Sequence, residues 1–117
     1  VKRIYVISNH QSGFIRAWHA HKIESKYVFI VNGTALISTV QIDNWDNPSN
    51  DLTVDKFVLT AKKPSILYIP SGYANGFKTL STETKIIFFS TSTLKDSIDD
   101  DYRYDAYKWN PWEIIER

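Results

Sequence analysis

The segment GFIRAWHAHK, residues 13–22, places two histidines one residue apart within an apolar stretch of β-forming residues. Side chains alternate between the two faces of a strand, so His19 and His21 would lie on the same face as Ala17. Burying two imidazoles among apolar groups costs free energy unless they meet water, a ligand or a hydrogen-bonding partner. The segment therefore predicts a strand whose inward face borders a pocket.

Short segments rich in β-branched and aromatic residues recur along the chain, separated by turn residues. The pair Asn32-Gly33 predicts a type I′ hairpin between the strands on either side of it, because both positions of that turn need positive φ. We expect strands near residues 2–8, 14–19, 26–31, 34–42, 53–59, 65–69, 75–80 and 85–91. Such a series, with no long helical period before residue 95, predicts an all-β jelly roll or barrel-like sandwich.

The C-terminal part of the chain gives a different pattern. Residues 94–107 are polar, acidic and aromatic, which predicts a surface loop, and KWNPWEII at 108–115 predicts a last short strand. A chain of 117 residues is long enough for one hydrophobic core and too short for two. We therefore expect a single domain over residues 1–117, with 94–117 as its loop-rich end.

The composition argues against several classes of partner and site. The net charge is +1 and no basic stripe is present, so no nucleic-acid partner is expected. No apolar run is long enough to span a bilayer and no signal peptide is recognisable, so we expect a cytoplasmic protein with no membrane partner. The absence of cysteine excludes disulfides, a thiolate nucleophile and a zinc–thiolate site.

The first histidine motif resembles that of the cupin superfamily, which consists of small jelly-roll β-barrels. Gly13, His19 and His21 have the spacing of the first cupin motif. RAWH at 16–19 resembles the Arg-Gly-Leu-His of the dTDP-4-dehydrorhamnose 3,5-epimerases. HAHK at 19–22 resembles the His-Ala-His-Lys of the sugar-nucleotide 3,4-ketoisomerases.

Two later motifs follow in the order found in the epimerases. IPSGYANGF at 69–77, with KTLS after it, resembles Val-Pro-x-Gly-Phe-Ala-His-Gly-Phe-x-x-Leu-Ser, and WNPWEI at 109–114 is similar to the end of that family. The resemblance implies a cupin jelly roll, a homodimer and no cofactor. It also implies epimerase or isomerase activity on a nucleotide-linked, dTDP-type 4-keto-6-deoxy sugar in surface polysaccharide biosynthesis.

The resemblance also implies roles for individual residues. His19 matches the base that removes the proton next to the ketone, a task suited to imidazole at neutral pH. His21 would be its partner, a proton relay or a second acid or base. Lys26 matches a lysine beside the developing oxyanion, whose charge it would stabilise.

Substrate binding is assigned to three further residues by the same resemblance. Arg16 matches an arginine whose guanidinium suits a phosphate or sugar oxygen. Strict alternation places Arg16 on the face opposite His19, so this role requires a β-bulge or twist at Ala17. Tyr73 and Asn75, in the later motif, are the other two, although Tyr73 also suits simple packing.

The sequence departs from the epimerase pattern in its acid residue. The tyrosine that acts as the acid in that family aligns here with Thr93 or Leu94, and the next tyrosine is Tyr102. A full double epimerisation therefore lacks its second proton donor, whereas a single epimerisation or a ketoisomerisation needs less. An aspartate among residues 96–101 would orient a histidine if that segment folded back.

We expect no metal site. Metal-binding cupins use two histidines and a glutamate from the first motif and a third histidine from the second. Here Glu24 lies too close to His21 for that spacing, and Asn75 replaces the third histidine. Two alternatives to a metal-independent epimerase or isomerase remain open: a non-catalytic sugar- or ligand-binding cupin, and a metal-dependent dioxygenase or isomerase.

Overall fold

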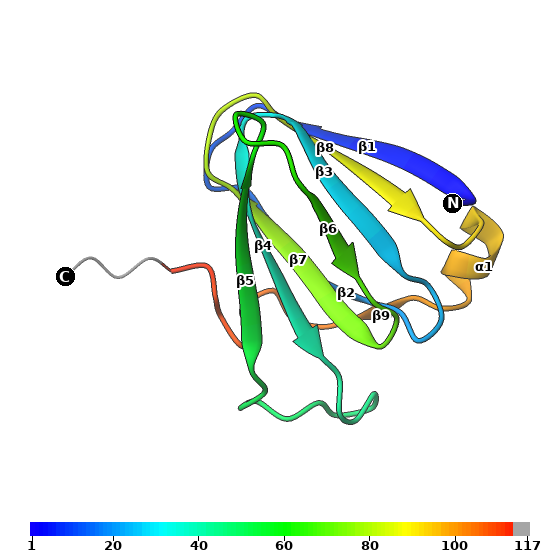
Figure 1. The fold of residues 1–117 in the computed structure, drawn as a ribbon. Helices are drawn as coiled ribbons and strands as arrows, with labels where there is room; N and C mark the ends of the chain where they lie inside the picture. Colours follow the sequence, from blue (N-terminus) through cyan, green and yellow to red (C-terminus); the bar gives the residue numbers. More distant parts are fainter. Residues whose placement is uncertain (114–117) are drawn as a thin grey trace.

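The computed structural model of the protein describes residues 1–113. Its strands are β1 (Arg3–Asn9), β2 (Ile15–Ala20), β3 (Lys26–Asn32), β4 (Thr34–Gln41), β5 (Val54–Thr60), β6 (Ile66–Ile69), β7 (Tyr73–Thr79), β8 (Thr84–Ser90) and β9 (Tyr102–Arg103). They form a four-stranded sheet, β1-β8-β3-β6, and a five-stranded sheet, β5-β4-β7-β2-β9, which face one another (Figure 1). Apart from β4 and β5, which pair with each other, consecutive strands alternate between the two antiparallel sheets, as in a jelly roll. The predicted all-β fold class is confirmed.

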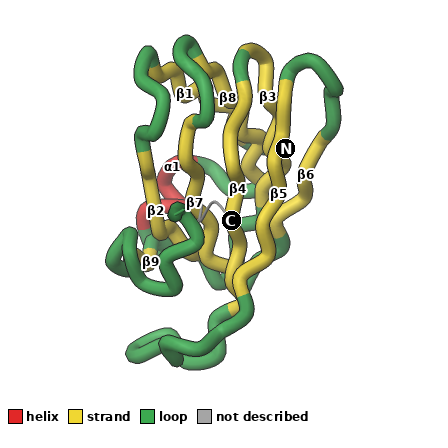
Figure 2. The backbone as a smooth tube through the Cα atoms, turned by 90° about the vertical axis from the view of Figure 1, so that its left-hand side faces the viewer, coloured by secondary structure: helices red, strands yellow, loops and turns green. Residues whose placement is uncertain are grey.

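The eight strands expected from the sequence up to residue 91 are all present, with small differences at their ends. Figure 2 shows them running along roughly one direction, with the loops gathered at the two ends. The hairpin predicted at Asn32-Gly33 is wrong. The strands β3 and β4 belong to different sheets, and only Gly33 of the pair has positive φ, at 80°. The strand β3 pairs with β6 and β8, and β4 pairs with β5 and β7, so this turn carries the chain from one sheet to the other.

The C-terminal segment is more ordered than predicted. Helix α1 (Leu94–Ile98) occupies part of the expected loop, and the Thr93 side chain caps it by accepting a hydrogen bond from the Asp96 N–H. The strand β9 then pairs with β2. The prediction of a strand at 108–115 is wrong for residues 108–113. These residues are irregular, and Trp109 has φ of 63°. Residues 114 and 115 lie outside the described part of the chain.

Two hydrophobic clusters hold the sheets. One lies between them: Val28, Ile30, Ala35, Ile37, Ile69, Phe77, Ile86 and Phe88. The other includes Leu36, the neighbour of Ile37 on β4, and therefore lies on the opposite face of the five-stranded sheet. Trp18 and Trp112 are buried in it, and the Trp18 Nε1–H donates a hydrogen bond to the Lys108 carbonyl oxygen at 2.8 Å. The C-terminal segment thus covers the outside of this sheet.

Within residues 1–113, no helix has the length and apolar character needed to cross a membrane.

Candidate active site

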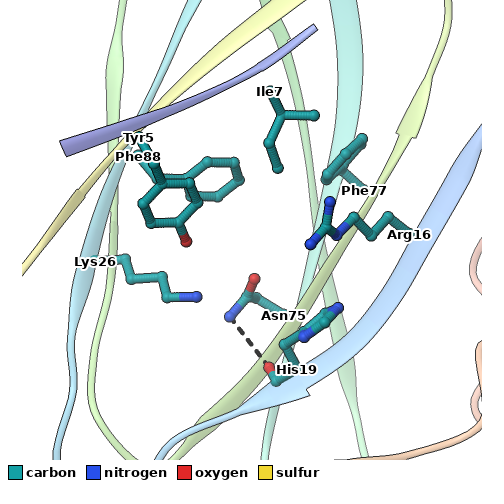
Figure 3. Close-up of a pocket in the computed structure, with 8 residues that line it drawn as sticks. All are labelled: Tyr5, Ile7, Arg16, His19, Lys26, Asn75, Phe77 and Phe88. Atoms are coloured by element: carbon teal, nitrogen blue, oxygen red, sulfur yellow. Dashed lines mark hydrogen bonds between the residues drawn. The ribbon is translucent and has the colours of Figure 1, made fainter. Parts of the chain in front are cut away.

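Two adjoining cavities lie between the sheets and share Tyr5, Arg16, His19 and Lys26. The smaller is drawn in Figure 3: Tyr5 and Lys26 come from the four-stranded sheet, and the other polar side chains face them from the five-stranded sheet. The larger has a volume of about 430 Å³ and extends to α1 and β9. That volume is within the range of small-molecule sites.

A β-bulge brings Arg16 and His19 to the same side of β2. In the pairing with β7, Arg16 lies opposite Phe77 and His19 lies opposite Asn75, so three steps along β2 match two along β7. The extra residue reverses the alternation between them, and both side chains line the smaller cavity (Figure 3). This is the irregularity that the sequence required for Arg16 to share a face with His19.

Gly76, inside β7, permits the close approach of the two strands at the bulge. A Cβ atom at this position would overlap the Cβ of Ala17 and lie 3.1 Å from the Trp112 ring. Gly76 is therefore a packing glycine within a strand. Gly72, by contrast, has φ of 87° and lies in the turn before β7.

His19 lies in an electrostatic setting that keeps its imidazole neutral. Burial lowers its pKa from 6.5 to about 4, and nearby positive charges, that of Arg103 first, act in the same direction. Asn75 fixes the backbone at this point, since its Nδ2 donates a hydrogen bond to the His19 carbonyl oxygen at 3.2 Å (Figure 3). A neutral imidazole in a cavity can accept a proton at neutral pH.

The cavities carry an excess of positive charge. Among the residues that line the larger one, only Asp101 is acidic, whereas four are basic: Arg3, Arg16, Lys26 and Arg103. Asp101 is paired with Arg103, at 3.1 Å between Oδ2 and Nε. Such a lining favours an anionic ligand, and guanidinium groups are well suited to phosphate oxygens.

A buried carboxylate, Glu24, lies behind the cavities. Its side chain is fully buried, and its Oε2 lies 3.2 Å from His21 Nε2 and 3.5 Å from Lys26 Nζ. Its other oxygen, Oε1, lies 3.5 Å from an Arg3 nitrogen. Burial raises the pKa of Glu24, but the charges of His21 and Lys26, together with hydrogen bonds from the Ser97 and Ser90 side chains, outweigh it and hold that pKa below its ordinary value.

The acidic segment after α1 folds back onto the histidine motif, through Asp100. Its backbone carbonyl oxygen lies 2.6 Å from His21 Nδ1. Its carboxylate accepts hydrogen bonds from the backbone N–H groups of Lys22, Ile23 and Glu24, at 2.8 to 2.9 Å. Asp100 thereby fixes both the ring of His21 and the turn that leads to Glu24.

Comparison with known proteins identifies the family. A family model described as dTDP-4-dehydrorhamnose 3,5-epimerase matches residues 3–113. The chain belongs to this family. The resemblance inferred from the three motifs is therefore confirmed.

One curated protein and two solved structures illustrate what the chain is similar to. The chain is 28% identical over 102 residues to the spore coat polysaccharide biosynthesis protein SpsL of Bacillus subtilis, a match that spans 86% of this chain and 62% of SpsL. The dTDP-4-dehydrorhamnose 3,5-epimerase of Bacillus anthracis, solved with TDP and PPi, has a TM-score of 0.78 at 22% identity over 97% of this chain and 66% of its own. ChmJ, a 3'-monoepimerase of Streptomyces bikiniensis solved with dTDP-quinovose, has a TM-score of 0.77 at 17% identity over 92% of this chain and 53% of its own. At these identities the structures show a shared fold, and the chain spans less than two thirds of SpsL.

The residues singled out from the sequence lie in three places. Arg16, His19, Lys26 and Asn75 line the smaller cavity, and His21 lines the larger one. Tyr73 lines neither and packs against the cluster between the sheets.

Sequence reasoning missed Tyr5 and Arg103, and it considered Glu24 only as a metal ligand. Tyr5 stacks on Phe88, with ring centroids 5.0 Å apart, and its hydroxyl points into the smaller cavity (Figure 3). The alternation of the first strand could have placed it inward, and the spacing His-x-x-Glu could have indicated a contact between His21 and Glu24. No signal in the sequence places Arg103 beside His19, because the two come together only through the pairing of β2 with β9.

Within residues 1–113, no three His, Asp or Glu side chains are grouped so that they could hold a metal ion. The expectation of metal-independent chemistry stays a prediction.

Proposed function

We propose that the protein is a dTDP-sugar epimerase or isomerase that acts on a nucleotide-linked 4-keto-6-deoxy sugar, in deoxysugar and surface polysaccharide biosynthesis. The observation that carries the proposal is the neutral imidazole of His19 in a cavity that also contains Lys26 and Arg16. The family match supports the same chemistry. The names of SpsL and of the two enzymes solved with nucleotides or a nucleotide sugar support the substrate class and the role in polysaccharide synthesis.

The chemistry begins with removal of a proton from the carbon next to the ketone. The imidazole of His19 accepts this proton, and the electron pair of the C–H bond moves into an enolate whose negative charge lies on the former ketone oxygen. The ammonium of Lys26 stabilises that charge, an effect that is strong in a partly buried site. Returning a proton to the same carbon from the opposite face gives the epimer. When the proton is taken from C3 and returned to C4, the former ketone oxygen becomes a hydroxyl, the C3 hydroxyl loses its proton, and the product is the 3-keto isomer.

The opposite wall of the cavity supplies a candidate for the returning proton. Tyr5 lies on the sheet that faces His19, with its hydroxyl directed into the cavity (Figure 3). The epimerases use a tyrosine as the acid at the position that is Thr93 or Leu94 in this chain. We assign that role to Tyr5. Tyr102 does not take this role, because its ring packs against Trp45 at 4.9 Å and it lines neither cavity.

The remaining basic residues suit the nucleotide diphosphate. Arg3, Arg16 and Arg103 surround the larger cavity, which adjoins the smaller one. A diphosphate there would extend from the sugar in the smaller cavity, with Asn75 beside the sugar. The proposed site needs neither a metal nor a cofactor.

Two further properties belong to the proposal. We place the protein in the cytoplasm, without a nucleic-acid or membrane partner, and treat residues 1–117 as one cupin domain. We also infer a homodimer, because apolar and aromatic side chains cover much of the outward face of the four-stranded sheet. They form two adjacent cross-strand rows: Ile4, Phe89, Tyr27 and Tyr68, and Val6, Ile87, Phe29 and Ile66.

Product analysis tests the function directly. The protein is incubated with a dTDP-4-keto-6-deoxyhexose, and the products are identified by proton NMR. New signals of a C3 or C5 epimer support an epimerase, and transfer of the ketone to C3 supports the ketoisomerase. Line broadening without any product supports a non-catalytic binding protein. Activity that is removed by a chelator and restored by a divalent metal would replace this proposal with the metal-dependent alternative.

A separate variant tests the role of Tyr5. We expect Tyr5→Phe to lower the turnover of an epimerase by about 10²-fold or more, the usual contribution of a general acid, with little change in KM. Tyr107→Phe is the matched control, because Tyr107 is exposed on the surface and lines neither cavity. Equal turnover of the two variants would remove Tyr5 from the mechanism.

A further inference from the structure

The two histidines of the HAHK motif are in different hydrogen-bonding situations, and this difference assigns them different roles. Both ring nitrogens of His21 are next to oxygen atoms: Nδ1 lies 2.6 Å from the Asp100 carbonyl and Nε2 lies 3.2 Å from Glu24 Oε2. The residue is only 6% exposed. An imidazole held in this way is not free to take a proton from a substrate.

The partners of His21 determine where its protons lie. The Asp100 carbonyl and the Glu24 carboxylate can both only accept a hydrogen bond, and the shorter contact, 2.6 Å at Nδ1 against 3.2 Å at Nε2, assigns the hydrogen of the neutral ring to Nδ1. A neutral imidazole has one N–H, and with that hydrogen on Nδ1 its Nε2 would present a lone pair to a carboxylate oxygen. A second proton, on Nε2, turns this repulsion into attraction.

Glu24 is the group that favours this second proton. Its Oε2 is buried and makes no well-formed hydrogen bond within the described residues, so its charge is balanced by the nitrogens of His21 and Lys26. The other charged groups at the pair are Arg3, from β1, and Asp100, whose carboxylate is held by backbone N–H groups.

Neighbouring groups shift the pKa of His21 in opposite directions, so its protonation depends on the Glu24 carboxylate. Burial and the charge of Lys26 lower the pKa of His21, whereas Glu24 and Asp100 raise it, and the net effect is a pKa below the ordinary 6.5. Without Glu24, only the Asp100 contribution would oppose the desolvation of an imidazolium in this position.

We propose that Glu24 is a positioning residue that controls the proton on His21 Nε2 and anchors Lys26 beside the cavity, which leaves His19 as the only imidazole free to act as a base. The catalytic consequence rests on the proposed function, whereas the protonation of His21 does not. Lys26 takes its place through the same carboxylate oxygen that contacts His21. The loss of Glu24 therefore alters both groups together.

The first test uses NMR of the ¹⁵N-labelled wild-type protein without any substrate. The chain has three histidines, so single His→Asn variants assign every imidazole signal. We expect the neutral form of His21 to be the Nδ1–H tautomer, with only Nε2 titrating. Free imidazole side chains favour the other tautomer, and finding Nε2–H in the neutral form of His21 would overturn the proposal.

The second test replaces the carboxylate. In Glu24→Gln we expect the titration midpoint of His21 to fall by one pH unit or more, because the amide keeps the shape and loses the charge. Glu83→Gln is the matched control, since Glu83 pairs with the exposed His10 at 2.7 Å. An unchanged His21 midpoint in Glu24→Gln contradicts the proposal. Should this variant not fold, Glu24→Asp keeps the charge and must retain the higher midpoint.

A kinetic test covers the effect on Lys26. We expect Glu24→Gln to lower kcat, and to have little further effect when Lys26→Gln is already present, because both changes act on one ammonium group. Additive losses in the double variant contradict the anchoring role. If the wild-type protein turns over no nucleotide sugar, the proposed function fails, and the two NMR tests still decide the role of Glu24.

Discussion

At the scale of single residues, the chemistry of the site depends on which of its side chains are charged and which are neutral. His19 is kept neutral by burial and by the surrounding cations, while Lys26 and Arg16 supply positive charge on either side of it. A base and its electrostatic partner need opposite protonation states at the same pH. The cavity supplies both, which is the pattern expected of acid–base catalysis.

The basicity of His19 should respond to Arg103. Its positive charge is the first electrostatic contribution, after burial, to lowering the pKa of His19 to about 4. We expect Arg103→Gln to raise that pKa, as measured by NMR titration of the His19 imidazole. A titration midpoint of His19 unchanged from that of the wild-type protein would show that Arg103 is screened by solvent.

The same pKa predicts how stability depends on pH. Since the pKa of His19 falls from 6.5 to about 4 on folding, the unfolded chain binds a proton between these values and the folded protein does not. His19 thus contributes stability that is fully present above pH 6.5 and is lost as the pH falls toward 4. We expect urea unfolding at pH 7 and pH 5 to differ less in His19→Asn than in the wild-type protein. An equal difference in both would contradict this account.

At the scale of secondary-structure elements, the bulge in β2 is what assembles the site. A regular strand would place Arg16 outside the cavity that His19 lines. The bulge lies against Gly76 of β7, where the absence of a side chain leaves room for Ala17.

Gly76→Ala tests the importance of this contact. The added Cβ overlaps that of Ala17, and overpacking of this kind costs about 1–3 kcal/mol of stability. We expect the loss in chemical unfolding, together with displaced amide signals for Arg16 and His19. The double variant Gly76→Ala/Ala17→Gly restores the space and should recover much of the loss. No recovery would mean that the Trp112 contact, or the strand backbone itself, dominates.

The sequence predicted the elements better than it predicted their contacts. Short alternating segments identified the first eight strands, because side-chain periodicity is a local property. The Asn32-Gly33 turn was misjudged as a hairpin because a local turn signal does not show whether its two strands pair. The roles of Glu24 and Tyr5 were overlooked for a related reason: they depend on residues brought near by folding, such as Asp100 and Phe88.

At the scale of the whole molecule, the two sheets have different surroundings. The C-terminal segment covers the outer face of the five-stranded sheet, whereas no segment within residues 1–113 covers the outer face of the four-stranded sheet. There Ile4, Val6 and Ile66 are each more than half exposed. An apolar face of this extent on a protein of this size is typical of an interface.

We expect this face to join two copies of the chain. A face with two full rows of uncharged side chains is complementary to itself, which suits a symmetric dimer. Analytical ultracentrifugation should show a dimer for the wild-type protein and a monomer for the Val6→Lys variant. Lys56→Ala, on the other sheet, is the control and should leave the dimer intact. A wild-type monomer at all concentrations would refute the dimer proposal.

Solvent deuterium exchange shows whether His19 removes the proton from the carbon next to the ketone. Proton NMR follows a dTDP-4-keto-6-deoxyhexose in heavy water with the wild-type protein, with His19→Asn, and with His10→Asn as an exposed control. We expect the C3 or C5 proton signal to disappear with the wild-type protein and with His10→Asn, and to remain with His19→Asn. Exchange at the wild-type rate in His19→Asn would contradict this role of His19.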